Sequence, residues 1–307
     1  MKQLAAGPLA AIERLVAAQP EAASVLAHVE DLPIHAFRFG SGKPVLIVTG
    51  GVHGLERIGS EVAIAFLGSL VTRLAWDQVL HDALARCRVV VVPLVNPVGM
   101  ARAQRANGNG VDLMRNAPAH PLGGTPLLGG QRISPRLPWF MGTAGAPMET
   151  EARALVDLVE AETAASPFAL ALDCHSGFGF IDRLWYPYAR TREPLPDRPA
   201  IDALGRLLDN ALPNHVYRFE QTAQAYTIRG DLWDYLYDRR REAGGTLLPL
   251  TLEMGSWAWV RKNPLQGLSS LGRFNPIKPH RQRRTLRRHL PLFEFLLHAA
   301  ASYDAWL

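Results

Sequence analysis

Apolar residues fall into short, unbroken runs that recur along the chain. These runs occupy residues 44–49, 88–95, 168–174 and 246–252. A strand has this pattern when helices cover both faces of its sheet, because neither face then contacts water. Further strands are predicted at residues 33–39, where apolar and polar side chains alternate, and at 184–188 and 215–219.

Segments of helical length separate these strands. We predict helices at residues 59–74, 148–164, 200–211, 231–239 and 284–303, and an amphipathic helix over 5–30 that breaks at Pro20. Strands that alternate with helices are typical of the α/β class. We therefore predict one domain over residues 1–307, with its core at about 33–260. Its sheet is expected to be mixed, mostly parallel and flanked by helices.

A long polar stretch interrupts this regular pattern. Residues 96–147 are rich in Gly and Pro and contain no predicted strand. Irregular connections longer than about 15 residues are uncommon in compact domains and are often functional. One interpretation of residues 120–145 is a lid over a site.

The composition is that of a globular protein. Apolar residues make up 48% of the chain and charged residues 20%, which argues against disorder. The net charge of +5 is partly local, because six of the Lys and Arg residues lie within 278–288. We interpret this basic stretch as the solvated face of the final helix. No aromatic residues alternate with these arginines, so nucleic-acid binding is not expected.

The two cysteines do not form a disulfide framework. Cys87 and Cys174 both lie in apolar runs, which favours buried thiols and a reducing compartment. The N-terminal residues lack the uninterrupted apolar core of a signal peptide. No apolar run reaches the roughly 20 residues of a membrane span. The expectation is a cytoplasmic protein without a membrane span.

Four residues with metal-site chemistry follow the apolar runs. His53 and Glu56 come after 44–49, His175 after 168–174, and Glu253 after 246–252. In open α/β sheets, ligands gather at the carboxyl ends of the strands, so these side chains are expected to converge. Three protein ligands leave one zinc coordination position open for water. Taken alone, the His-x-x-Glu pair favours an ordinary turn with an exposed histidine over a metal site.

The polar stretch contains a more specific motif. Residues 105–118 read RANGNGVDLMRNAP. This segment resembles the R-x-N-x-x-G-V-D-L-N-R-N signature of the zinc carboxypeptidases, the M14 metallopeptidases. The preceding Asn96-Pro97-Val98-Gly99 resembles the N-P-D-G of that family. The resemblance covers about residues 45–260 and implies the zinc carboxypeptidase fold.

The resemblance assigns the metal site. It makes His53, Glu56 and His175 the ligands of one zinc ion per chain. Asp112 matches the carboxylate that accepts the other ring N–H of the first histidine. That hydrogen bond fixes the tautomer of the imidazole.

The resemblance also assigns the catalytic and substrate-binding residues. Glu253 matches the general base, which takes a proton from the attacking water and passes it to the leaving nitrogen. Arg105 matches the group that stabilises the developing oxyanion. Arg115, Asn116 and Tyr226 match positions that contact the substrate, with Arg115 holding its terminal carboxylate.

Several positions stay open at this stage. Tyr226 lies in a loose match and is equally interpretable as a buried or stacking side chain. Trp233 is either the floor of a specificity pocket or part of the core. Asp173 shares a strand face with His175, where it either supports that ligand or caps the strand.

Two departures from the family pattern bear on specificity. Met114 stands where the family usually has an Asn that helps to bind the substrate carboxylate, and Val98 replaces the Asp of N-P-D-G. We hypothesise that the hydrolytic residues are intact while selectivity for a free C-terminus is altered.

The expected function is a zinc-dependent metallopeptidase that cleaves near the free C-terminus of a peptide. The alternative is an N-acyl amino acid amidohydrolase, like the related aspartoacylase and succinylglutamate desuccinylase group. Sequences of that group often carry Asp-x-His and Glu-x-Gly, as residues 173–175 and 253–255 do here. A third interpretation, which Met114 alone supports, is an inactive zinc-binding homologue. The expected partner is therefore a peptide or an N-acyl amino acid.

Overall fold

One mixed β-sheet runs through the molecule. The computed structural model describes residues 7–118 and 128–307. Within these ranges the sheet has eight strands in the order β1-β2-β4-β3-β5-β8-β6-β7. Their bounds are β1 Ala23–Val29, β2 Leu32–Phe39, β3 Val45–Gly50, β4 Arg88–Val92, β5 Phe168–Ser176, β6 Arg183–Tyr186, β7 Arg218–Gln221 and β8 Thr246–Met254.

The centre of the sheet is parallel and its edges are mixed. Strand β3 pairs in parallel with β4 and β5, and β5 pairs in parallel with β8. Antiparallel pairs join β2 to β4, β1 to β2 and β6 to β8. The four central strands therefore end at one edge of the sheet. This arrangement confirms the predicted α/β class with a mixed, mostly parallel sheet.

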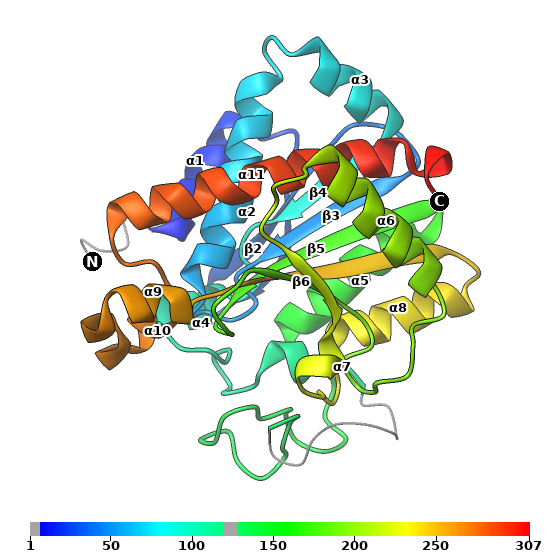
Figure 1. Cartoon of the computed structure of the whole chain (residues 1–307). Helices are drawn as coiled ribbons and strands as arrows, with labels where there is room; N and C mark the ends of the chain where they lie inside the picture. The colour runs from blue at the N-terminus through cyan, green and yellow to red at the C-terminus, as the bar shows by residue number, and fades with distance from the viewer. Residues whose placement is uncertain (1–6, 119–127) are drawn as a thin grey trace.

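Helices cover both faces of the sheet (Figure 1). The α-helices are α1 Pro8–Ala18, α2 Arg57–Arg73, α3 Gln78–Arg86, α4 Pro97–Arg102, α5 Thr150–Ala164, α6 Arg198–Ala211, α7 Thr222–Ala225, α8 Leu232–Glu242, α9 Trp257–Lys262, α10 Ser270–Phe274 and α11 Pro279–Ala301. Short 3-10 helices are η2 Leu113–Arg115, η3 Pro264–Leu268 and η4 Tyr303–Ala305. The predicted long helices are present, and α11 begins five residues before the predicted start at 284.

The prediction of helix over residues 5–30 is wrong beyond Pro20. Helix α1 ends at Ala18, and residues 23–29 form the edge strand β1. The pairing of β1 with β2 supplies backbone hydrogen bonds that local sequence reasoning does not include. Strand β1 is only half-buried, so its apolar pattern is weak.

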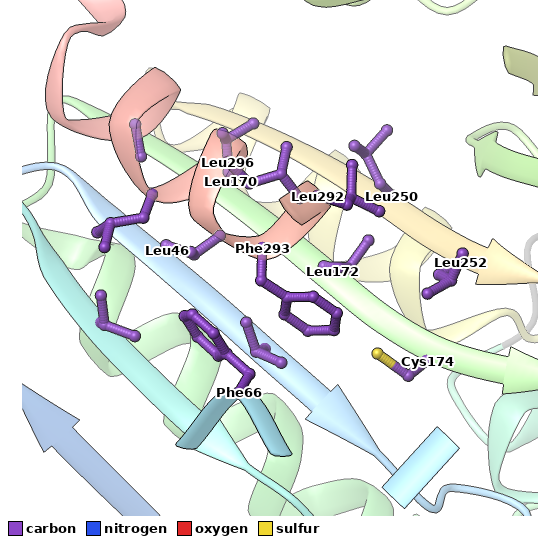
Figure 2. Close-up of a cluster of buried hydrophobic side chains, with 14 of the residues drawn as sticks. Leu46, Phe66, Leu170, Leu172, Cys174, Leu250, Leu252, Leu292, Phe293 and Leu296 are labelled. Carbon is purple, nitrogen blue, oxygen red and sulfur yellow. The ribbon is translucent and has the colours of Figure 1, made fainter. Parts of the chain in front are cut away.

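The core consists of two layers, one on each face of the sheet. Leu46 and Val48 of β3 belong to the layer that α2 and α11 cover, and Val45 and Ile47 to the layer that α5 and α8 cover. Figure 2 shows the first layer, with Phe293 of α11 above the strands. Because both faces are buried, the strand sequences are continuously apolar, as predicted.

Cys174 points into this first layer, where Figure 2 shows its thiol beside leucines of the neighbouring strands. Both cysteines are free and buried. Burial raises the pKa of the Cys174 thiol well above its usual value. The prediction of a core thiol is confirmed.

Helix α2 lies unusually close to strand β5 because of a glycine. A Cβ atom on Gly59 would lie 2.1 Å from the carbonyl oxygen of Cys174. The turn before α2 also needs glycine, since Gly51 has a positive φ of 66°. These glycines bring the start of α2 against the carboxyl ends of β3 and β5.

The structure also bears on the predicted absence of a membrane span and on the suggested lid. Within the described ranges no single helix is long and apolar enough to cross a membrane; α2 and α3 meet that test only as a pair bent by 112°. Residues 120–127 of the suggested lid over 120–145 lie outside the described residues, and the lid stays a prediction. The role of the basic stretch at residues 278–288 stays a prediction.

Candidate active site

Three side chains with metal-ligand chemistry meet at the carboxyl edge of the sheet. His53 follows β3, Glu56 immediately precedes α2, and His175 lies near the end of β5. One ligand atom from each lies within 4.8 Å of the others. The Nδ1 atom of His53 is 2.9 Å from Glu56 Oε1, and Nδ1 of His175 is 3.0 Å from Glu56 Oε2. All three residues are buried.

The donor atoms of this triad fit a zinc ion. The Nε2 atom of His53 is 3.0 Å from Asp112 Oδ1, and Nε2 of His175 is 2.8 Å from Asp173 Oδ2. A carboxylate beside each Nε2 favours a proton there, which leaves the lone pair of Nδ1 free to bind a metal. Among the described residues, His53 Nδ1 is buried without a hydrogen-bond partner. Two nitrogens and a carboxylate oxygen are a typical catalytic zinc set.

Asp173 supports the ligand His175, which settles the question that the sequence leaves open. It is completely buried on β5. Thr49 Oγ1 donates to its Oδ1 at 2.7 Å, and Trp233 Nε1 donates to its Oδ2 at 2.9 Å. Burial acts to raise the pKa of Asp173, but His175 and these donors hold it below its ordinary value. The Asp-x-His spacing on one strand face is the sequence signal for this role.

The polar motif folds into a compact loop around Asn107. The Oδ1 atom of Asn107 accepts from the backbone N–H of Asn109 and of Val111, each at 3.0 Å. Gly110 has a φ of +78°, as expected for a turn glycine. Main-chain hydrogen bonds then fix Asp112, whose N–H donates to Phe140 O. The loop therefore places Asp112 without help from the sheet.

Asp112 connects the candidate metal ligand His53 to two arginines. Its Oδ2 accepts from Arg105 Nε at 3.0 Å and from Arg115 Nη1 at 2.8 Å. Burial acts to raise the pKa of Asp112, but Arg115, Arg105 and His53 hold it well below its ordinary value. The predicted contact of Asp112 with His53 is present, and the same carboxylate also orients both guanidiniums.

Arg105 and Glu253 lie beside the triad. Arg105 Nη1 donates to Glu56 Oε1 at 3.0 Å, and its side chain is 26% exposed. Glu253 lies opposite His175 in the register of β5 and β8, and its Oε1 accepts from the N–H of Phe178 at 2.8 Å. Burial, followed by the nearby Glu56, raises the pKa of the Glu253 carboxyl. A basic carboxylate of this kind is suited to proton transfer.

These groups line one cavity of about 940 Å³. Of the site residues that the sequence suggests, the cavity wall includes His53, Glu56, Arg105, Asp112, Arg115, His175, Tyr226 and Glu253. Aromatic side chains form much of the remaining wall, among them Trp139, Phe178, Trp185, Trp233 and Phe274. A largely apolar cavity with a few converging polar groups is the usual form of a ligand site.

Arg115 has an unused donor on the cavity wall. It is 2% exposed, and its Nη1 is paired with Asp112. Its Nη2 lies 3.5 Å from Leu128 O, and its Nε has no hydrogen-bond partner among the described residues. A buried donor without a partner is costly unless a ligand satisfies it.

The structure does not bring Asn116 to the cavity wall. Its Nδ2 donates to Met141 O at 3.1 Å, and its Oδ1 accepts from Glu149 N at 2.6 Å. Backbone groups thus engage both ends of the amide, and the suggested substrate contact of Asn116 stays a prediction. Met114 does line the cavity and is 6% exposed.

The aromatic residues of the cavity resolve two open interpretations. The Tyr226 ring lies 5.8 Å from Phe178 in a tilted contact and 5.7 Å from Trp185 in an edge-on contact, and it also lines the cavity. Trp233 lines the cavity while it holds Asp173. Sequence reasoning missed Phe178, because its contribution is a backbone N–H that carries no sequence signal.

The Asn96 motif braces the turn that carries His53. Asn96 Oδ1 accepts from Gly99 N at 2.8 Å, and its Nδ2 donates to Val52 O at 3.2 Å. Val98, which departs from the N-P-D-G pattern, is buried in α4. Its side chain does not line the cavity.

Comparisons with known proteins agree with this geometry. The family model described as "Zinc carboxypeptidase" matches residues 9–257. Rat carboxypeptidase A1 is 24% identical over 254 residues, which are 74% of this chain and 57% of the relative. Mouse carboxypeptidase A4 is 25% identical over 231 residues, or 68% of this chain and 52% of the relative. The chain thus spans about half the length of these curated relatives.

The fold is also found among solved structures. The crystal structure of thrombin activatable fibrinolysis inhibitor superposes with a TM-score of 0.70 at 17% identity. The match covers 94% of this chain and 72% of that one. At this level of identity the likeness concerns the fold.

Proposed function

Because the chain belongs to the zinc carboxypeptidase family, we propose that it hydrolyses the peptide bond that precedes a free C-terminal carboxylate. The observation that carries this proposal is Arg115. Its guanidinium is buried on the cavity wall, has an unpaired Nε among the described residues, and shares Asp112 with the metal-binding residue His53. A guanidinium with an unused donor matches the geometry of a carboxylate.

The residues around the triad supply the chemistry. A bound zinc ion would contribute Lewis acidity and activate water for attack at neutral pH. Glu253 accepts the proton of the attacking water and delivers it to the leaving nitrogen. Arg105 lies beside Glu56 and donates to the oxygen on which negative charge develops. Asp112 and Asp173 hold the two imidazoles in the tautomer that the ligand role requires.

The cavity is large enough for either a short peptide or an N-acyl amino acid. Small-molecule sites usually measure about 300–1,000 Å³. A volume of about 940 Å³ is at the upper end of that range. Hydrolysis of N-acyl amino acids is the alternative that the experiment below distinguishes. The cytoplasmic location expected from the sequence stays a prediction.

The test compares matched substrates with the zinc-loaded protein, with and without chelator. Each peptide is supplied as a free acid and as its C-terminal amide, beside a set of N-acyl amino acids, and products are identified by mass spectrometry. We expect chelator-sensitive loss of one residue from the free acids alone. Equal cleavage of the amides, or cleavage of the N-acyl compounds alone, would contradict the proposal.

A variant that removes the charge of Arg115 sharpens this test. Arg115→Met keeps much of the side-chain volume but removes every donor. We expect it to abolish the preference for free acids over amides. Arg287→Ala serves as the matched control, because Arg287 is exposed on α11 and is not part of the cavity wall.

A further inference from the structure

The segment that follows Glu253 forms a platform at the mouth of the cavity. It comprises α9, η3 and α10, and Figure 1 shows α9 and α10 together at the end of the sheet to which β8 leads. Its apolar side chains are unusually exposed: Trp257 at 45%, Leu265 at 77% and Leu268 at 83%. Phe180, from the loop before β6, lies against it and is 51% exposed. We name this surface the rim platform.

A second cavity of about 530 Å³ opens on the rim platform. Phe180, Trp257 and Arg261 contribute to its wall. Gly177, Arg273 and Phe274 line both this cavity and the catalytic one. The two cavities therefore adjoin and share a wall at Phe274, so a chain that extends past Phe274 from the catalytic cavity would reach the second.

The second cavity combines aromatic surface with positive charge. The rings of Phe180 and Trp257 are 5.6 Å apart at an interplanar angle of 84°, and the guanidinium of Arg261 lies 5.2 Å from the Phe180 ring. Across the part of the chain that the structure describes, neither Arg261 nor Arg273 is paired with a carboxylate. Such a surface is complementary to aromatic and acidic side chains.

Contacts from α11 brace the platform and add to its charge. Arg281 Nη1 donates to Trp259 O at 3.3 Å, and its Nη2 donates to Lys262 O at 3.2 Å. These carbonyls belong to the last turn of α9, where a cation is favourable. The platform is thus a fixed surface with a cationic border.

The position of Arg115 decides which part of a substrate reaches the platform. Arg115 is bonded to Asp112 and lies against the Gly230 turn. Phe274 instead lies beyond the ligand His175, with its carbonyl accepting from Ser176 Oγ at 2.7 Å. Under the proposed function, a peptide whose terminal carboxylate binds Arg115 would pass the triad toward Phe274, which lines the same cavity. Only its acyl side, upstream of the scissile bond, then extends over the platform.

We propose that the rim platform binds the acyl-side segment of the substrate peptide and selects aromatic and acidic side chains there. This inference rests on the proposed function. It makes cleavage depend on the side chains of substrate residues two or more positions before the scissile bond. The catalytic cavity alone does not select these residues.

The experiment uses peptides with one common C-terminal dipeptide. The preceding residues are Glu-Phe in one peptide and Lys-Gly in the other. We expect kcat/KM to be about tenfold higher for the Glu-Phe peptide, from one aromatic contact and one exposed ion pair. Arg261→Glu should reverse the part of this ratio that depends on charge, and Phe180→Ser should remove the aromatic part. Arg287→Ala, on α11 outside both cavities, is the control and should keep the ratio.

A binding measurement separates failure of this inference from failure of the proposed function. Calorimetry with the full-length Glu253→Gln variant reports the affinity of both peptides without turnover. If neither peptide is cleaved by the native protein but the Glu-Phe peptide still binds more tightly, the proposed function is wrong and the platform stands. Equal affinities, together with equal kcat/KM values, would overturn the platform. Normal unfolding curves for Arg261→Glu and Phe180→Ser exclude misfolding as the cause of any loss.

Discussion

The substitution Asp112→Asn tests how the metal site and the arginines depend on each other. Asp112 accepts hydrogen bonds from His53, Arg105 and Arg115 through its two oxygens. The Asn side chain has the same shape but only one acceptor oxygen. Its N–H₂ group would face a donor, either His53 Nε2 or the two arginines. The variant therefore keeps the volume of the side chain and removes its charge.

The largest cost falls on Arg115. Arg105 retains Glu56 as a partner at 3.0 Å, and its side chain is 26% exposed. The Arg115 side chain is 3% exposed, and Asp112 is its carboxylate partner among the described residues. Removing one member of a buried ion pair costs about 3–5 kcal/mol. We expect the free energy of unfolding, measured in urea with chelator present, to fall by an amount of this order.

Zinc affinity should fall as well, because the Nε2 of His53 loses its charged acceptor. Loss of such a supporting carboxylate weakens metal binding by about 10- to 100-fold. Competition with a chromophoric chelator measures this change directly. The matched control is Asp77→Asn, a carboxylate at the start of α3 that pairs with Arg73. It should alter stability without a change in zinc affinity. Native zinc affinity and native stability in Asp112→Asn would refute the reasoning.

Four further predictions follow from the contacts described above. Glu253→Gln should lower kcat by about 10²- to 10⁴-fold while zinc affinity stays unchanged; weaker zinc binding would instead make Glu253 a ligand. Met114→Asn should raise the kcat/KM ratio of free-acid over amide peptides about tenfold, since it adds a donor on the cavity wall; an unchanged ratio would show that Met114 does not limit carboxylate binding. Gly59→Ala should destabilise the fold by about 1–3 kcal/mol, because the added Cβ would lie 2.1 Å from Cys174 O. Gly68→Ala, in the same helix with nothing within 4 Å of the added Cβ, should be neutral or stabilising in the same denaturant titration. Burial, followed by the neighbouring Asp231, raises the pKa of Asp234, so the folded protein retains a proton that the unfolded chain loses above about pH 4. Stability should therefore fall as pH rises from there toward the raised pKa of the folded state, and Asp234→Asn should flatten this slope in urea titrations at successive pH values; a parallel slope would contradict the assignment.

The sheet and the convergence of the candidate site residues were predictable because they obey long-range rules. Burial on both faces makes strands β3, β5 and β8 continuously apolar, and parallel strands bring their carboxyl ends to one edge. His175 and Glu253 are even direct neighbours in the register of β5 and β8. The order of the strands follows from none of these patterns, because pairing between distant segments leaves no local signal.

The errors share a physical cause, which is that a partner elsewhere in the chain decides the outcome. Strand β1 looks helical by local pattern, yet its pairing with β2 decides its conformation. The backbone partners of the Asn116 amide, Glu149 and Met141, are likewise distant in sequence and leave no local signal. The platform helices α9 and α10 have 6 and 5 residues, too short to show a helical period.

The distribution of charge predicts that Asp112 is the most sensitive position of the site. The carboxylates of Glu56 and Asp112 face the guanidiniums of Arg105 and Arg115, so these four charges sum to zero. The imidazole of His53 must be neutral to bind a metal. A bound zinc ion would therefore supply the excess positive charge that draws a carboxylate substrate into the cavity. Because Asp112 contacts both the imidazole proposed to bind the metal and the guanidinium proposed to bind the carboxylate, its loss should weaken both interactions, whereas the loss of Arg115 should weaken only the second.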